Sequence, residues 1–305
     1  MIRAHLAALS CALCALHGAS NAWAQSATAA PPASTSPAAA PSAQPDPAAW
    51  PFPLFRPVEY ATTAVVGVAA IGAFFIATPQ TNVHWSGGIL FDDAVRSALA
   101  LHSQSARTAA RTASNVTAVG AEAITIGVDS ILVPVARGRL TMAEQLVLMD
   151  AESYAFSSLL TTTAYDVTGR ARPSYADCQK NPSYDVLCNS APTASFWSGH
   201  TAEAFTGAGL SCAHHAYAHV YGDPLADALG CAGMISIGAA TGTLRILGDR
   251  HYATDVLTGA LVGFGFGYGM PTVLHYTWAG RKGSAVSASF SPMSGGLGLR
   301  VAGVF

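Results

Sequence analysis

The chain has 305 residues, of which 51% are hydrophobic and only 10% are charged. Soluble domains carry roughly a quarter charged residues, so this composition favours a membrane protein or an Ala-rich helical core. The formal net charge is −2 and no run of Lys or Arg is present, which argues against a nucleic-acid partner.

The N-terminus has the pattern of an exported protein. Arg3 precedes an apolar stretch that ends at Leu16, and the Ala-x-Ala step before Gln25 fits signal-peptidase cleavage. We therefore expect a signal peptide over residues 1–24. Residues 25–53 are rich in Ala, Pro and Ser and almost uncharged, a composition that predicts a linker without a core.

Six hydrophobic runs follow the linker, each close to the roughly 20 residues that cross a bilayer. They cover residues 60–77, 116–136, 146–165, 201–221, 226–247 and 253–277. The first run has no charge and is expected to be the only clean transmembrane segment. Charges in the other runs are costly in lipid unless they face the interior of a bundle, so the pattern predicts an all-α bundle of about six core helices.

Two segments outside these runs have their own patterns. Residues 91–115 place Arg107 and Arg111 one helical turn apart beside apolar positions, which predicts an amphipathic helix at an interface. In the tail, apolar residues alternate on both sides of a turn at 292–296, which predicts a short C-terminal hairpin within residues 281–305.

Five glycines occur close together, at positions 259, 263, 265, 267 and 269. No strand precedes them and they lie in an aromatic, helix-like run. Close helix packing is therefore favoured over a dinucleotide-binding loop.

Four of the six cysteines remain once the signal peptide is removed. Cys178 and Cys188 flank a polar loop that contains Asn-Pro, and in an oxidising envelope they are the natural disulfide pair. A metal clip is the alternative, but that loop holds no His and no second Cys pair. Cys212 and Cys231 lie in apolar runs and are expected to be small core residues.

Three stretches of the second half concentrate groups that handle a phosphate. In GRARPSY, Arg172 precedes a proline that ends a helix, which leaves its guanidinium free for bidentate phosphate contact. In FWSGH, Ser198 and Gly199 stand where a helix begins, and free backbone N–H groups there favour an anion. Ser198 is equally suited to a structural N-cap. His200 at such a site can donate a proton to a leaving oxygen.

The third stretch, TLRILGDRHYATDVLTG, contains Arg245, His251 and Asp255. On a helix, His251 and Asp255 share one face, so the carboxylate can accept the Nδ1 proton and leave Nε2 as a nucleophile. A surface pair four residues apart is the plain alternative.

Together, RP, SGH and RxxxxxHxxxD resemble the three-part signature of the type 2 phosphatidic acid phosphatase (PAP2) superfamily, which also includes bacterial acid phosphatases and vanadium haloperoxidases. The resemblance covers roughly residues 89–275. It implies a PAP2-type helical bundle, here a phosphatase domain over residues 54–280, and a reaction without a metal or other cofactor. Nothing in the sequence singles out a haloperoxidase.

The resemblance also implies roles for individual residues. His251 attacks phosphorus to form a phosphohistidine and is held by Asp255, while His200 protonates the leaving group and then activates water. The groups that hold the phosphoryl oxygens are Arg172, Arg245, Ser198 and Gly199.

The sequence departs from the family pattern at three positions. The lysine seven residues before the RP arginine is replaced by Tyr165, so the affinity for phosphate should fall unless Arg170 compensates. Trp197 replaces the usual proline and Leu244 the usual serine. We favour a working enzyme because the other motif residues are present, and a phosphate- or lipid-binding protein that has lost turnover is the alternative.

A further group, Cys212 with His214, His215 and His219, has a spacing that could bind a metal. It lies where a helix should end, so structural or interfacial roles are favoured and no metal site is expected.

The expected location contains a conflict. A cleaved signal peptide puts the mature N-terminus outside the cytoplasmic membrane, and three crossings before the RP motif then put that motif in the cytoplasm, against a disulfide between Cys178 and Cys188. We expect an envelope protein that is associated with the membrane and whose active site faces the periplasm.

The expected activity is hydrolysis of a phosphomonoester or pyrophosphate. The apolar composition favours a lipid substrate such as a phosphatidate, a polyprenyl diphosphate or lipid A. A soluble periplasmic acid phosphatase of broad specificity is the enzymatic alternative, and protein partners cannot be inferred from the sequence.

Overall fold

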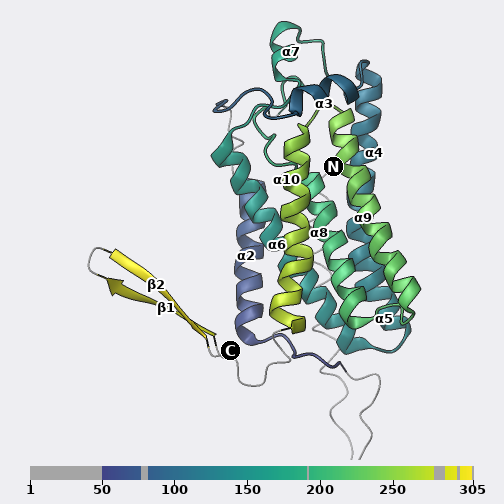
Figure 1. The fold of residues 1–305 in the computed structure, drawn as a ribbon, viewed down its shortest axis with the longest axis vertical. Helices are drawn as coiled ribbons and strands as arrows, with labels where there is room; N and C mark the ends of the chain where they lie inside the picture. Colours follow the sequence, from purple (N-terminus) through teal and green to yellow (C-terminus); the bar gives the residue numbers. More distant parts are fainter. Residues whose placement is uncertain (1–49, 77–81, 191, 278–285, 294–295, 304–305) are drawn as a thin grey trace, which may run out of the picture.

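The computed structural model describes residues 50–76, 82–190, 192–277, 286–293 and 296–303. The predicted signal peptide and all but the last residues of the predicted linker lie outside these ranges. Figure 1 shows an elongated bundle of helices.

Six long rods build the bundle, and each overlaps one of the six predicted hydrophobic runs. They are α2 (Pro57–Ile76); α4 (Gln104–Glu122) continued by η2 (Ala123–Leu132) and α5 (Val133–Ala136); α6 (Leu140–Thr168); α8 (Gly199–Ala213) continued by η3 (His214–Ala218); α9 (Pro224–Leu247); and α10 (Ala253–Phe264) continued by η4 (Gly265–Gly269) and η5 (Thr272–Thr277). The η segments are π-helical. Two short helices, α3 (Asp92–Leu99) and α7 (Tyr175–Lys180), lie at one end of the bundle (Figure 1). The all-α class of the domain is confirmed in the described residues.

After the bundle the chain forms β1 (Val286–Met293) and β2 (Gly296–Gly303), an antiparallel pair with Val286 opposite Gly303. Figure 1 draws this pair to one side of the helices. The hairpin as an element of the fold stays a prediction.

The single amphipathic helix predicted over residues 91–115 is wrong. Ser103 is extended and its Oγ accepts a hydrogen bond from the Ala106 N–H, so it caps a new helix and separates α3 from α4. Arg107 and Arg111 are buried instead of lying at an interface, because both bind the Asp185 carboxylate. α4 is therefore part of a core rod.

The core of the bundle changes along its length. Large side chains fill the end away from α3 and α7, where the core cluster includes Phe55, Met142, Leu146, Met149 and Tyr276. In the middle, three of the four buried residues of the cluster are alanines: Ala121, Ala204 and Ala208, beside Met234. Small residues allow the helices to approach closely along the half of the bundle that leads to α3 and α7.

Three glycines let the α10–η4 rod lie directly against α8. Gly259, Gly263 and Gly267 follow one another at intervals of four residues and share a helix face. A Cβ added at these positions would lie under 3.0 Å from the carbonyl oxygens of Ser198, Ala202 and Thr206. The other two glycines of the predicted set have open space around them, so close packing is confirmed for three of the five.

Two disulfides are present in the described residues. Cys178–Cys188 closes the loop after α7, as predicted. Cys212–Cys231 joins α8 to α9, so the expectation of two unlinked core cysteines is wrong. The sequence did not predict this disulfide, because both cysteines lie in apolar helices and meet only when the chain turns back between α8 and α9.

Three helical segments are long and apolar enough to cross a membrane, by length and composition: Gln104–Ala136, Pro224–Leu247 and Ala253–Thr277. Their exposed positions carry no charged side chain. The first hydrophobic run, by contrast, is a shorter apolar helix, Pro57–Ala73. The expectation that it is the only clean transmembrane segment is therefore wrong, because the charged groups of the other runs are buried or half-buried in the bundle.

The close contact between α10 and α8 predicts that a larger residue at Gly263 destabilises the protein. Gly263→Ala should lower the free energy of unfolding by about 1–3 kcal/mol, because the added methyl group overlaps the α8 backbone and forces the two helices apart. Gly265→Ala is the matched control, since its Cβ meets nothing within 4 Å, and alanine should be neutral or stabilising there. Thermal unfolding of both variants tests this, and equal stabilities would contradict the close contact.

Candidate active site

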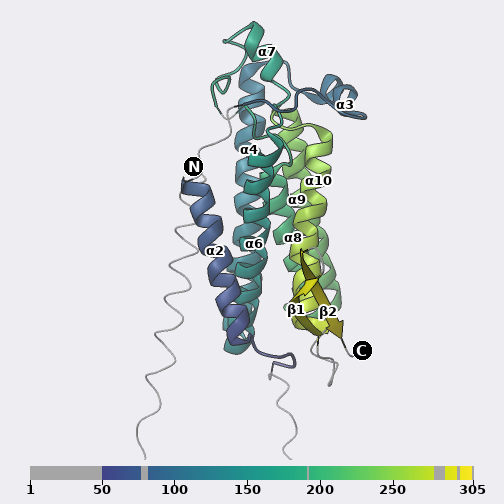
Figure 2. The same ribbon diagram turned by 90° about the vertical axis from the view of Figure 1, so that its left-hand side faces the viewer.

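The predicted motifs meet at one end of the bundle. α6 and α9 both run toward the end that carries α3 and α7, and α8 and α10 both begin there (Figures 1 and 2). The Ser198 N–H donates to the Asp255 carbonyl at 3.0 Å, which fixes the start of α8 beside the start of α10. The residues brought to this end are Arg172, Ser198, Gly199, His200, Arg245, His251 and Asp255.

The hydrogen bonds of His251 define which ring nitrogen carries its proton. Nδ1 lies 2.8 Å from the Ser195 carbonyl oxygen, which can only accept. Nε2 lies 3.1 Å from Nη1 of Arg172, which can only donate. The ring is therefore protonated at Nδ1 and presents a lone pair at Nε2, as a nucleophile requires.

The surroundings keep this imidazole neutral. Burial lowers the pKa of His251 well below its usual value, and the positive charges of Arg172, Arg245 and Arg250 add to the shift. The hydrogen bond to the Ser195 carbonyl opposes it and is the smaller effect. Because a lowered pKa disfavours the imidazolium, the Nε2 lone pair persists at neutral pH.

The predicted hydrogen bond between Asp255 and His251 is not formed. His251 precedes α10, whose N-cap is Tyr252, so the two residues do not share a helix. The distance from His251 Nδ1 to Asp255 Oδ2 is 3.9 Å, too long for a hydrogen bond. Asp255 Oδ2 instead accepts from Ser195 Oγ at 2.7 Å and from the Tyr252 N–H at 2.9 Å. Ser195 therefore connects the carboxylate to the imidazole.

Arg170 lies between two carboxylates and is fully buried. Its Nη2 is 2.8 Å from Asp92 and its Nη1 is 2.5 Å from Asp255. The rings of Trp85 and Tyr252 cover the guanidinium carbon at 4.0 and 4.3 Å. Because two carboxylates balance its charge, Arg170 holds the scaffold together and does not offer the compensation expected for the missing lysine.

Tyr165 contacts the start of α8. Its hydroxyl accepts a hydrogen bond from the Gly199 N–H at 2.8 Å. Ser198 is the N-cap residue, but its Oγ makes no capping bond and accepts from Thr201 Oγ1 at 2.8 Å. His200 follows in the first turn of α8 and is half-buried. The Gly199 N–H, which was predicted to bind a phosphoryl oxygen, therefore donates to a neutral phenol instead.

Arg172 and Arg245 are both buried near His251. Arg172 Nη1 also donates to the carbonyl of Arg250 at 2.9 Å. Arg245 Nη1 lies 3.3 Å from Ser114 Oγ on α4, and its Nε is buried without a hydrogen-bond partner among the described residues. A buried guanidinium with an open donor is suited to bind an anion oxygen.

Sequence reasoning missed four residues at this end of the bundle. They are Asp92, Asp185, Ser195 and Arg250. Arg250 carried a readable signal, because it is a cation directly before His251. The others did not, since Asp92 meets Thr254 of α10 only through the fold, and Ser195 acts on His251 through its backbone carbonyl.

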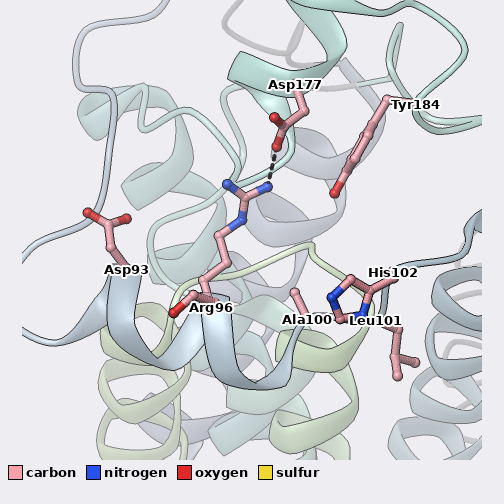
Figure 3. A pocket seen from close by; sticks show the side chains of 8 residues that line it. Asp93, Arg96, Ala100, Leu101, His102, Asp177 and Tyr184 are labelled. Atoms are coloured by element: carbon pink, nitrogen blue, oxygen red, sulfur yellow. Dashed lines mark hydrogen bonds and ion pairs between the residues drawn. The ribbon is translucent and has the colours of Figure 1, made fainter.

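A surface cavity of ≈ 320 Å³ lies beside the turn that precedes His251. Arg96 binds both carboxylate oxygens of Asp249, at 2.7 and 2.8 Å. It also binds Asp177 at 2.6 Å (Figure 3). Tyr184 donates to Asp249 at 3.0 Å. Asp249 has a positive φ of 55°, so these contacts hold a turn that favours glycine or asparagine. The wall of the cavity thus supports the catalytic end.

The histidines after Cys212 lie among buried carboxylates. His214 Nε2 is 2.9 Å from Asp150, and His215 Nδ1 is 2.7 Å from Asp227. Within the described ranges no group of three or more His, Cys, Asp and Glu residues has a geometry that could hold a metal ion. These contacts join helices of the bundle.

Comparison with known proteins gives one match. Residues 148–279 match the family model of the PAP2 superfamily. This range begins within α6, ends after η5 and contains all three predicted motifs. No curated protein and no solved structure matches the chain.

The two buried ion pairs of Arg170 predict that its replacement destabilises the protein. Arg170→Gln should lower the free energy of unfolding by about 3–5 kcal/mol, because it leaves Asp92 and Asp255 buried without a counter-charge. Thermal unfolding of the full chain measures this. Arg139→Gln, at the far end of the bundle, should shift the free energy by less than about 0.5 kcal/mol. Equal stability of the two variants would contradict the role of Arg170.

Proposed function

The chain belongs to the PAP2 superfamily, and we propose that it is a metal-independent phosphatase that forms a phosphohistidine on His251. The single observation that carries this proposal is the contact of 3.1 Å between Arg172 Nη1 and His251 Nε2. It places the cation that we propose as a phosphate ligand beside the unprotonated ring nitrogen of His251. A phosphoryl group that meets Arg172 therefore meets the nucleophile.

The reaction follows from these positions in two steps. The Nε2 lone pair attacks phosphorus while the bond from phosphorus to the leaving oxygen breaks, and His200 gives its proton to that oxygen. His200 then removes a proton from water, whose oxygen attacks the phosphohistidine and breaks the N–P bond. The products are the alcohol or phosphate leaving group and inorganic phosphate, and both histidines return to their starting forms.

The charges around His251 support both steps. Phosphorylated His251 becomes cationic, and the Ser195 carbonyl at 2.8 Å and the Asp255 carboxylate at 3.9 Å stabilise that charge. Arg172 and Arg245 act on the phosphoryl oxygens, where negative charge gathers in the transition state. Fixed guanidinium groups in a buried site stabilise this charge without reorganising.

A lipid phosphate is the proposed substrate class. Three helical segments of the bundle are apolar enough to cross a membrane, and their exposed positions are uncharged. The catalytic groups lie at an end of these helices, the height at which a lipid headgroup meets water. A phosphatidate, a polyprenyl diphosphate or lipid A fits this arrangement.

We propose that the active site faces the periplasm. The disulfide Cys178–Cys188 lies in the segment that connects Arg172 to Ser198, so this end of the bundle matures in an oxidising compartment. The disulfide between α8 and α9 also fits an exported protein.

A soluble periplasmic phosphatase of broad specificity is the second candidate, and the path of α2 favours it. α2 begins at the end away from the active site, whereas His84, shortly after α2, donates to the Gly169 carbonyl at the active-site end. With a cleaved signal peptide, the start of α2 is periplasmic. The active site is then periplasmic only if α2 does not cross the membrane.

Substitution of the two histidines tests the mechanism. His251→Ala should lower kcat for any phosphate ester by about 10³-fold or more, because no nucleophile remains. His200→Ala should lower kcat/KM by about 10²–10⁴-fold with an alkyl or lipid phosphate. The loss of kcat/KM, which reports the step before water attacks, should be much smaller with p-nitrophenyl phosphate, whose leaving oxygen needs no proton. His219→Asn, at an exposed position with a positive φ, is the control and should keep full activity.

The outcome separates an enzyme from a binding protein. Equal background hydrolysis by the wild type and His251→Ala would contradict the proposed activity and favour a phosphate- or lipid-binding protein. An equal loss for both leaving groups in His200→Ala would contradict its role as the general acid.

Location is tested by fractionation and latency. After expression in a Gram-negative host, we expect the protein in membranes that resist carbonate extraction. Spheroplasts should hydrolyse a membrane-impermeant aryl phosphate as fast before lysis as after it. Activity that emerges only on lysis would contradict a periplasmic site, and recovery from the soluble periplasmic fraction would select the second candidate.

A further inference from the structure

Arg250 is a buried guanidinium directly before His251. It is 7% exposed, and its side chain forms no hydrogen bond or ion pair with any residue that the structure describes. A guanidinium taken out of water normally gains a carboxylate, because an unpaired buried charge is costly. Three other buried arginines at this end, Arg107, Arg111 and Arg170, each have one.

The backbone around Arg250 ties it to the nucleophile. Its N–H donates to the Arg245 carbonyl at 3.1 Å, and its carbonyl accepts from Arg172 Nη1 at 2.9 Å. The same Nη1 contacts Nε2 of His251, the next residue. Arg250 is therefore held between the two arginines that act on the phosphoryl group.

The local charge balance favours an anion at this position. Burial and the positive charges of Arg172, Arg245 and Arg111 lower the pKa of Arg250. Asp185 is the carboxylate that opposes them, but it already binds Arg107 and Arg111. An anionic ligand is the remaining way to balance this cluster.

The position of the missing lysine is not filled by the groups expected to fill it. Tyr165 is neutral and its hydroxyl accepts the Gly199 N–H. Arg170 is balanced by Asp92 and Asp255. A site with two cations in place of three would bind a phosphoryl group weakly.

We propose that Arg250 is a third arginine ligand of the phosphoryl group and supplies the charge that Tyr165 lacks. This inference rests on the proposed function, because it assigns a ligand to the same site. It adds a binding residue at a variable position of the third motif, directly before the nucleophile in the sequence.

Inhibition by inorganic phosphate and by orthovanadate tests the proposal on the full chain in detergent. Arg250→Gln should raise the inhibition constant of both anions about 10–100-fold, the loss expected for a charge-assisted hydrogen bond. Arg250→Lys should retain part of the affinity. Arg139→Gln removes a charge at the far end of the bundle and should leave the constants unchanged. An unchanged constant in folded Arg250→Gln would overturn the proposal.

Tyr165→Lys gives a second readout that a structural role would not produce. In the Arg250→Gln background, the added lysine should recover affinity at least tenfold, whereas in the wild type it should change little because Arg250 already supplies the charge. An equal gain in both backgrounds would show that Arg250 does not take the place of the lysine. If Arg250→Gln does not fold, the same comparison in Arg250→Lys decides, since the partial loss there should again be recovered.

The test stands apart from the proposed activity. Calorimetric binding of inorganic phosphate reports on Arg250 even if the wild type shows no turnover. Loss of hydrolysis in His251→Ala supports the phosphatase assignment whatever the result for Arg250.

Discussion

The approach of α10 to α8 is the constraint on which the catalytic end depends. Gly259, Gly263 and Gly267 have no side chain between the two backbones, and the resulting contact runs along most of α8. It leaves the helices little freedom to slide, because any Cβ on this face meets a carbonyl oxygen. At the active-site end of this helix contact, the Ser198 N–H donates a hydrogen bond to the Asp255 carbonyl. Backbone packing alone therefore aligns the start of α8 with the start of α10, where two of the three motifs lie.

The arginines at this end divide into two groups with different physical roles. Arg96, Arg107, Arg111 and Arg170 bind carboxylates and join α3, α4 and the loops to the bundle. Arg245 and Arg250 form no ion pair with a carboxylate in the described part of the chain. The arginines paired with carboxylates stabilise the fold, whereas the positive charges of Arg245 and Arg250 act on His251. The placement of the few carboxylates therefore decides which arginines at this end form ion pairs in the described part of the chain.

The sequence predicted the parts of this structure that depend on local pattern. Hydrophobic runs of helical length predicted the rods, and the motifs predicted that Arg172, His200 and His251 come together at one end of the bundle. It failed where partners are distant or where an element begins at an unexpected residue. Asp92 and Asp185 carry no motif, and Cys212 and Cys231 meet only after the chain turns. The relation of His251 to Asp255 was misread because spacing by four implies a shared helix, whereas the helix starts at Tyr252.

The loop closed by Cys178 and Cys188 contains two residues that bind other parts of the bundle. Tyr184 and Asp185 lie inside this ring, one bound to the Asp249 turn and the other to two arginines of α4. Ring closure restricts both anchors at once, so oxidation reduces the entropy that each would otherwise lose on folding. Formation of this disulfide is thereby coupled physically to the order of the turn that precedes His251.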